Sequence, residues 1–113
     1  MGESCTIELL FVPGCSSRDE TVALIQRLAG HHPFQATITE TFINTPEEAE
    51  ERKILGSPSI RVNGIDIDPT AERRIDFGLG WRVYQDEAGR FLKKIPEKML
   101  VSVLTNKFKR LRD

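Results

Sequence analysis

The chain has 113 residues, of which 39% are hydrophobic and 29% are charged, a composition that excludes a disordered or fibrous protein. This length suits one compact domain, and we predict a single domain over residues 1–113. The formal net charge of −1 gives no electrostatic reason to expect nucleic acid as a partner.

The longest apolar run, residues 7–13, is interrupted by Glu8 and is far too short to span a bilayer. The first four residues show neither the basic start nor the long apolar segment of a secretory signal. We therefore expect a cytoplasmic protein without a membrane partner. The sequence makes no prediction about its oligomeric state.

The first half of the chain predicts two strands with a helix between them. Residues 6–12 form an apolar run of strand length, typical of a strand that is buried on both faces. Residues 16–28 carry apolar side chains at helical spacing, with acidic residues in the first turn and Gly30 placed to end the helix. Residues 34–43 alternate apolar and polar side chains, which predicts the second strand.

A second helix is indicated by the residues that would start it. Thr45 can cap a helix, Pro46 is tolerated at the first helical position, and Glu48 completes a capping box. We expect this helix to end near residues 55–56.

The next segment predicts short strands and a loop. Residues 59–62 and 65–67 indicate two strands that are joined by a tight turn at Asn63-Gly64. Residues 68–78 are polar and irregular, and we expect a surface loop there. Residues 81–84 predict one further short strand.

From Pro96 onward, apolar residues recur at helical spacing and predict a closing helix with a basic end. Its expected apolar face consists of Met99, Leu100, Val103, Leu104, Phe108 and Leu111. The element order β-α-β-α-β-β-α requires a parallel strand pair with a right-handed crossover and adds an antiparallel hairpin. We therefore predict an α/β fold with a mixed sheet, residues 6–12 in its central strand, and helices on both faces.

Two cysteines, Cys5 and Cys15, stand near opposite ends of the first predicted strand. A rise of about 3.3 Å per residue would separate them by roughly 25–30 Å, whereas a disulfide requires Cα atoms within about 7 Å. We therefore predict no disulfide between them and interpret Cys5 as an ordinary strand residue. Cys15 lies where the strand passes into the helix, and a helix N-terminus stabilises a thiolate.

Two stretches of the chain resemble the thioredoxin-like superfamily. "VPGCSSR" is similar to its active-site turn, and "LGSPSIRVNG" is similar to the loop that holds its cis-proline. The resemblance covers nearly the whole chain and implies a thioredoxin-like fold. It also implies that the Ser57–Pro58 bond is cis, that Pro58 packs beside Cys15, and that Ser57 presents backbone groups to a ligand. The same binding surface would include Pro13, Gly14 and Ser16.

The chain also resembles small bacterial thioredoxin-like proteins that are sometimes labelled alkylmercury-lyase-like. The shared patterns are an "IELL…GC" opening, a "TPEEAE…LGSPSI.VNG.D" middle and an "R-x-Y…G…P" ending, which runs from Arg82 through Gly89 to Pro96. The resemblance implies a cysteine where Trp81 stands, so a second thiol is lost here. Organomercury cleavage uses several cysteines and an acid, whereas this sequence offers one well-placed thiol.

Arg18 stands where a C-x-x-C site has its resolving cysteine, so a dithiol cycle within this site is excluded. Our first hypothesis is a monothiol oxidoreductase or thiol-transfer protein with Cys15 as nucleophile and Arg18 as an auxiliary charge. The Ser57-Pro58 backbone would hold the partner, a protein or glutathione thiol or disulfide. We expect no resident cofactor and no metal, with glutathione as the candidate co-substrate.

Two alternatives belong to other functional classes. The chain could be a redox-inactive thioredoxin-fold binding module that uses the same groove. It could also handle a soft metal or an iron–sulfur cluster through Cys15, although the Cys-Gly-Phe-Ser motif typical of such proteins is absent. We interpret Trp81 as a packing residue, His31 and His32 as solvated surface, and the basic residues 107–112 as a helix C-terminus that the helix dipole favours.

Overall fold

The structure, a computed structural model, describes the backbone of residues 4–30 and 35–112 and the side chains of residues 5–30 and 36–105. The predictions for His31, His32 and Phe34 lie outside these residues. The same holds for the side chains expected at the end of the closing helix.

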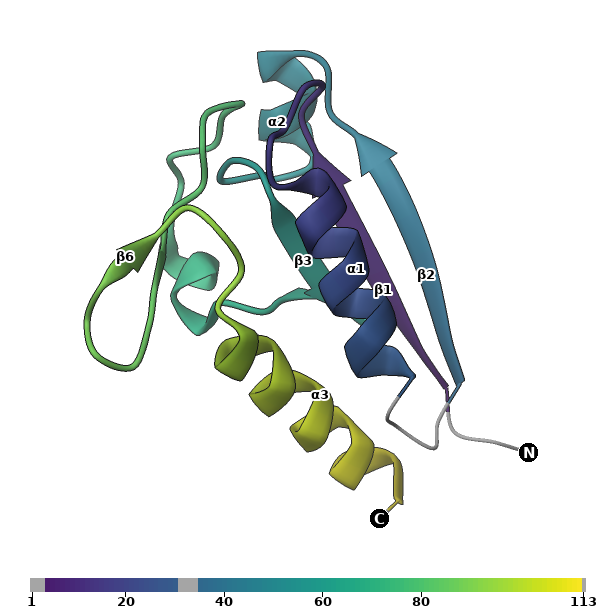
Figure 1. Ribbon diagram of the computed structural model, residues 1–113. Helices are drawn as coiled ribbons and strands as arrows, with labels where there is room; N and C mark the ends of the chain where they lie inside the picture. Colours follow the sequence, from purple (N-terminus) through teal and green to yellow (C-terminus); the bar gives the residue numbers. More distant parts are fainter. Residues whose placement is uncertain (1–3, 31–34, 113) are drawn as a thin grey trace.

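A mixed sheet of four strands forms the centre of the described structure (Figure 1). The strands are β1 (Ser4–Phe11), β2 (Gln35–Phe42), β3 (Ser59–Val62) and β4 (Ile65–Asp66), and they lie in the order β2-β1-β3-β4. β1 pairs with β2 in parallel and with β3 antiparallel, and β4 pairs antiparallel with β3. The prediction of a central first strand between its two predicted neighbours is therefore confirmed.

One face of the sheet is covered by two helices, α1 (Arg18–Ala29) and α3 (Glu97–Arg112), as Figure 1 shows. Alternate residues of a strand point to the same face, so every second residue of β1 faces these helices. Buried apolar side chains of β1, α1 and α3 share the main core: Cys5, Ile7, Leu9, Phe11, Ile25, Leu28, Leu100 and Leu104. The apolar residues at helical spacing in the sequence are therefore the residues with which α1 and α3 contribute to this core.

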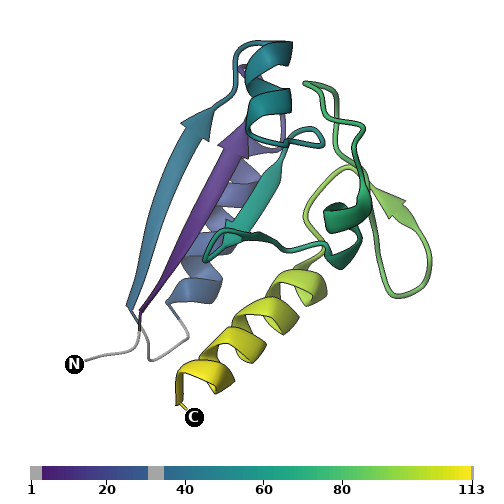
Figure 2. The ribbon, with the colours of Figure 1, turned by 180° about the vertical axis from the view of Figure 1, so that it is seen from behind.

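On the opposite face, the helix among the described residues is the short α2 (Pro46–Glu51), which lies at one end of the sheet, as seen from behind in Figure 2. Ala49 of α2 packs with Leu10 of β1, which points away from the main core, and with Ile43 and Ile54. Helices therefore lie on both faces, as predicted, but the coverage is unequal.

The predicted start of α2 is confirmed, whereas its predicted end is wrong. The Thr45 hydroxyl accepts a hydrogen bond from the Glu48 amide at 3.1 Å, so Thr45 caps the helix. The helix ends at Glu51 because Lys53 adopts a left-handed backbone conformation with φ of 58°, which no helix can continue.

The segment between the sheet and α3 differs from the prediction in two places. The expected loop begins with a 3₁₀ helix, η1 (Pro69–Arg73), which the Asp68 side chain caps through the Thr70 amide. The strand expected at 81–84 is instead β5 (Tyr84–Gln85).

β5 pairs with a strand that was not predicted, β6 (Phe91–Leu92). The turn between them is built by Asp86, whose carboxylate accepts hydrogen bonds from the backbone of Ala88 and Arg90. Gly89 supplies the positive φ of 83°. No helix in the described part of the chain combines the length and the hydropathy that crossing a membrane would require.

Candidate functional site

Cys15 sits in a tight turn between β1 and α1. Its amide donates to the Val12 carbonyl at 3.1 Å, and Gly14 supplies a positive φ of 79°. The Cys15 carbonyl accepts from the amide of Arg18, the first residue of α1. Cys15 therefore lies just ahead of the helix, as predicted, but only 9% of the residue is exposed. Its neighbours Pro13, Gly14 and Ser16 are exposed.

Arg18, which was predicted to supply an auxiliary charge at Cys15, is paired with two carboxylates, and its role at the thiol stays a prediction. Its guanidinium donates to Glu40 of β2 at 2.9 Å and to Asp19 at 2.8 Å. These hydrogen bonds, first to Glu40 and then to Asp19, raise the pKa of Arg18. Because Leu9 of β1 pairs with Glu40 of β2, the Glu40 carboxylate lies next to the start of α1 and accepts a hydrogen bond from Arg18.

The loop before β3 contacts the cysteine turn through Ser57. The Ser57 hydroxyl accepts a hydrogen bond from the Val12 amide at 3.1 Å, and the Val12 carbonyl in turn accepts from Cys15. Two segments that are 45 residues apart in sequence are thereby joined. The Ser57–Pro58 bond is cis, as predicted, and both residues are buried. A direct contact between Pro58 and Cys15 stays a prediction.

The backbone of Ser57 is not free for a ligand, contrary to the expectation from the resemblance. Its amide donates to the Gly80 carbonyl at 3.0 Å, and its carbonyl accepts from the Arg82 amide at 3.0 Å. Trp81 thus forms a parallel bridge with Ser57. The two segments fit closely, because a Cβ atom on Gly56 would lie 2.7 Å from the Gly80 carbonyl oxygen.

Behind this contact lies a buried arginine that sequence reasoning did not single out as a site residue. The Arg82 side chain is fully buried, and its guanidinium makes a bidentate contact with Asp66 at 2.6 and 2.7 Å. It also donates to the Ser59 hydroxyl at 3.0 Å and lies 3.9 Å from Asp68. The Nε atom has no hydrogen-bond partner among the described residues.

Charge balance explains how this arginine stays ionised. Burial lowers the pKa of Arg82, but hydrogen bonds to Asp66 and the surrounding charges outweigh burial, so the pKa is raised overall. The Asp66 and Asp68 carboxylates supply the negative charge that a buried guanidinium needs.

Tyr84 connects the buried arginine to the proline loop. Its ring lies under the guanidinium, with 4.6 Å between the Arg82 Cζ and the ring centroid, and its hydroxyl donates to the Pro58 carbonyl at 2.6 Å. Burial raises the pKa of Tyr84 well above its ordinary value. Arg82 and Tyr84 therefore hold the loop of Ser57 and Pro58 from one side, while Val12 contacts it from the other.

The second thiol, Cys5, belongs to the core of β1 and not to this site. It is buried, and burial raises the pKa of the thiol. Both cysteines are free, which confirms the prediction of no disulfide between them.

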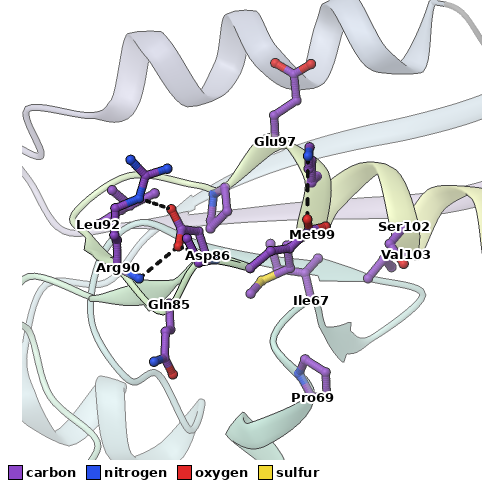
Figure 3. A pocket seen from close by; sticks show the side chains of 14 residues that line it. Ile67, Pro69, Gln85, Asp86, Arg90, Leu92, Glu97, Met99, Ser102 and Val103 are labelled. Carbon is purple, nitrogen blue, oxygen red and sulfur yellow. Dashed lines mark hydrogen bonds and ion pairs between the residues drawn. The ribbon is translucent and has the colours of Figure 1, made fainter.

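A hollow near the C-terminal hairpin lies apart from the predicted site (Figure 3). It has a volume of about 610 Å³ and lies between the β5–β6 hairpin and the start of α3, with Ile67, Leu92 and Met99 among its lining residues. None of the predicted site residues lines it. Within residues 5–30 and 36–105, no group of three His, Cys, Asp or Glu side chains could hold a metal ion.

The sequence contains no local signal for the missed residues. Alternation over residues 81–84 would place the apolar Trp81 and Val83 on the inner face. The structure instead buries Arg82 and Tyr84 and exposes Trp81 and Val83. Comparison of the chain with protein-family models and with curated proteins gives no match.

Proposed function

We propose that the chain is a thioredoxin-like monothiol protein in which Cys15 exchanges with a disulfide. The strand order β2-β1-β3-β4, with Cys15 after β1 and Pro58 before β3, supports a thioredoxin-like arrangement. A cytoplasmic location and a glutathione or protein partner belong to the same proposal.

One observation carries the proposal: hydrogen bonds connect the Cys15 turn to the Ser57-Pro58 loop through Val12. A thiol in this turn is held in one place at the end of the sheet. Ser17, which precedes α1, makes no side-chain cap. The Arg18 amide already donates to the Cys15 carbonyl, so the helix offers a nearby negative charge only the amides that follow Arg18 in the first turn.

The reaction that follows is thiol–disulfide exchange. The Cys15 thiolate attacks one sulfur of a disulfide, a new S–S bond forms, and the old S–S bond breaks. The departing sulfur takes the electron pair and then a proton from water, so Cys15 is oxidised and the leaving thiol is reduced. Because Arg18 occupies the place of a resolving cysteine, an external thiol must attack the mixed disulfide to release Cys15.

The proposal is tested by treating the folded protein with glutathione disulfide and measuring the intact mass. Wild type should gain one glutathione, Cys5→Ser should gain one as well, and Cys15→Ser should gain none. An unmodified wild-type protein, or an adduct found at Cys5 alone, would contradict the proposal.

A redox-inactive binding module is the second candidate, because several observations favour it. Cys15 is largely buried, and Arg18 is paired with Glu40. Trp81, which forms the bridge with Ser57, is a large apolar side chain that is 51% exposed. In this case Cys15→Ser would leave binding of the partner unchanged, and glutathione disulfide would not modify wild type.

A further inference from the structure

The segment of Gly80, Trp81 and Arg82, here called the inner strand, forms hydrogen bonds with the backbone amide and carbonyl of Ser57. An extended peptide that docks by strand addition needs a free amide and a free carbonyl on the edge it joins. Both groups of Ser57 are bonded to Gly80 and Arg82. The position beside the Cys15 turn where a peptide could pair is therefore filled by the chain itself.

The inner strand is fastened by buried groups. The Arg82 guanidinium is fully buried against Asp66, Ser59 and the Tyr84 ring. Gly56 lies so close to the Gly80 carbonyl that even a methyl group would not fit between them. Moving the inner strand away from Ser57 would break this packing and separate the buried Arg82 guanidinium from its partners. Leaving a buried charge unpaired lowers the stability of the fold.

Cys15 itself is largely buried. Only 9% of the residue is exposed, although the flanking Pro13, Gly14 and Ser16 are open to solvent. A small disulfide needs only to bring one sulfur in line with the thiolate, whereas an extended peptide must also find room for its backbone.

We infer that Cys15 exchanges with low-molecular-weight disulfides and discriminates against cysteines within extended peptides, because the inner strand fills the backbone edge at Ser57. This inference rests on the proposed function and names the substrate class of the same site. In each case the Cys15 thiolate forms the new S–S bond, and the small thiol leaves with the electron pair of the broken bond and is then protonated.

The test uses two probes with the same leaving group, 2-mercaptoethanol. In one probe it is disulfide-bonded to N-acetylcysteine amide, and in the other to the central cysteine of an extended peptide with apolar flanks. Rates of mixed-disulfide formation on the Cys5→Ser protein are divided by the rates for free N-acetylcysteine, which corrects for the intrinsic reactivity of each probe. Cys15 should react with the peptide probe several-fold more slowly, because the peptide backbone must find room beside Gly80, Trp81 and Arg82.

A matched pair of variants identifies the inner strand as the cause. Asp66→Asn removes the charge partner of Arg82 and should raise the peptide rate several-fold while leaving the small-probe rate unchanged. Asp76→Asn removes an exposed partner of Arg74 in the neighbouring loop and should change neither rate. Circular dichroism verifies that both variants are folded, and the wild-type selectivity stands as a test without them.

The outcomes separate the two proposals. Equal corrected rates for both probes, or a faster reaction with the peptide, would overturn the substrate class and leave the exchange function standing. No reaction of Cys15 with either probe would overturn the proposed function, and the substrate class with it.

Discussion

Two arginines near the Cys15 turn, Arg18 and Arg82, differ in burial and in their contacts. Arg18 follows Cys15 in the sequence, yet 42% of its side chain is exposed and it pairs with carboxylates on the surface. Arg82 is distant in sequence and fully buried, and it holds the loop that contacts the Cys15 turn. Exposed pairs contribute about 0–1 kcal/mol, whereas removing one partner of a buried pair costs about 3–5 kcal/mol. The charge that shapes the site is therefore the remote one.

The largest effect is expected for Arg82→Ala. The substitution leaves Asp66 and Asp68 without their cation and opens a cavity over Tyr84, so the free energy of unfolding should fall by about 3–5 kcal/mol. Urea unfolding followed by circular dichroism measures this change. A loss under about 1 kcal/mol would put Arg82 in the same class as Arg18 and remove the contrast.

The next largest effect is expected for Tyr84→Phe. The ring and its contact with Arg82 remain, but the buried Pro58 carbonyl loses the donor that lies at 2.6 Å. An unsatisfied buried acceptor costs about 1–3 kcal/mol, measured as the change in unfolding free energy at neutral pH. A neutral substitution would mean that the hydroxyl does not hold the proline loop.

The pH dependence of stability sharpens the same point. Burial raises the folded-state pKa of Tyr84 above its unfolded value of about 10. The corresponding stability is fully present below pH 10 and is lost as the pH rises further, by at most about 1.4 kcal/mol per pH unit. Tyr84→Phe should therefore lose less stability than wild type between about pH 10 and 11.

The chain has one tyrosine, so ultraviolet absorbance of the tyrosinate reports this group alone. The folded protein should show no ionisation near pH 10, and ionisation should appear together with unfolding. A reversible titration of the folded protein at pH 10 would show that Tyr84 is open to water.

The smallest effect is expected for Arg18→Ala. Its pairs with Glu40 and Asp19 are exposed and screened by solvent, so the unfolding free energy should change little. The rate at which Cys15 forms the glutathione adduct should also change little, because the guanidinium lies on Glu40. A large drop in that rate would instead support the predicted role of Arg18 at the thiol.

Features set by neighbouring residues could be predicted from the sequence. The Thr45-Pro46 start of α2 and the Asn63-Gly64 turn follow from local chemistry, and both turn residues have the positive φ that such a hairpin requires. The central position of β1 follows from its apolar run. The place of Cys15 ahead of α1 was predicted in the same way, from the strand and helix on either side of it.

Features set by contacts between distant segments could not be predicted. Arg18 faces Glu40 because of the register of β1 and β2, which no local pattern fixes. Arg82 reaches Asp66 across a segment that contains the unpredicted helix η1. The hydrogen bonds between the inner strand and Ser57 could not be predicted either. The position of the inner strand depends on the buried ion pair of Arg82 and not on strand propensity.

The most direct test of the account compares the two thiols within the native protein. Cys5 and Cys15 are both buried, but only Cys15 lies in a turn whose neighbours are exposed. Pulsed alkylation with site-resolved mass spectrometry should show Cys15 modified at least about tenfold faster than Cys5, because Cys5 reacts only when the core opens. Equal rates for the two thiols, both matching the rate of global unfolding, would show that Cys15 is a core residue and would contradict the exchange site.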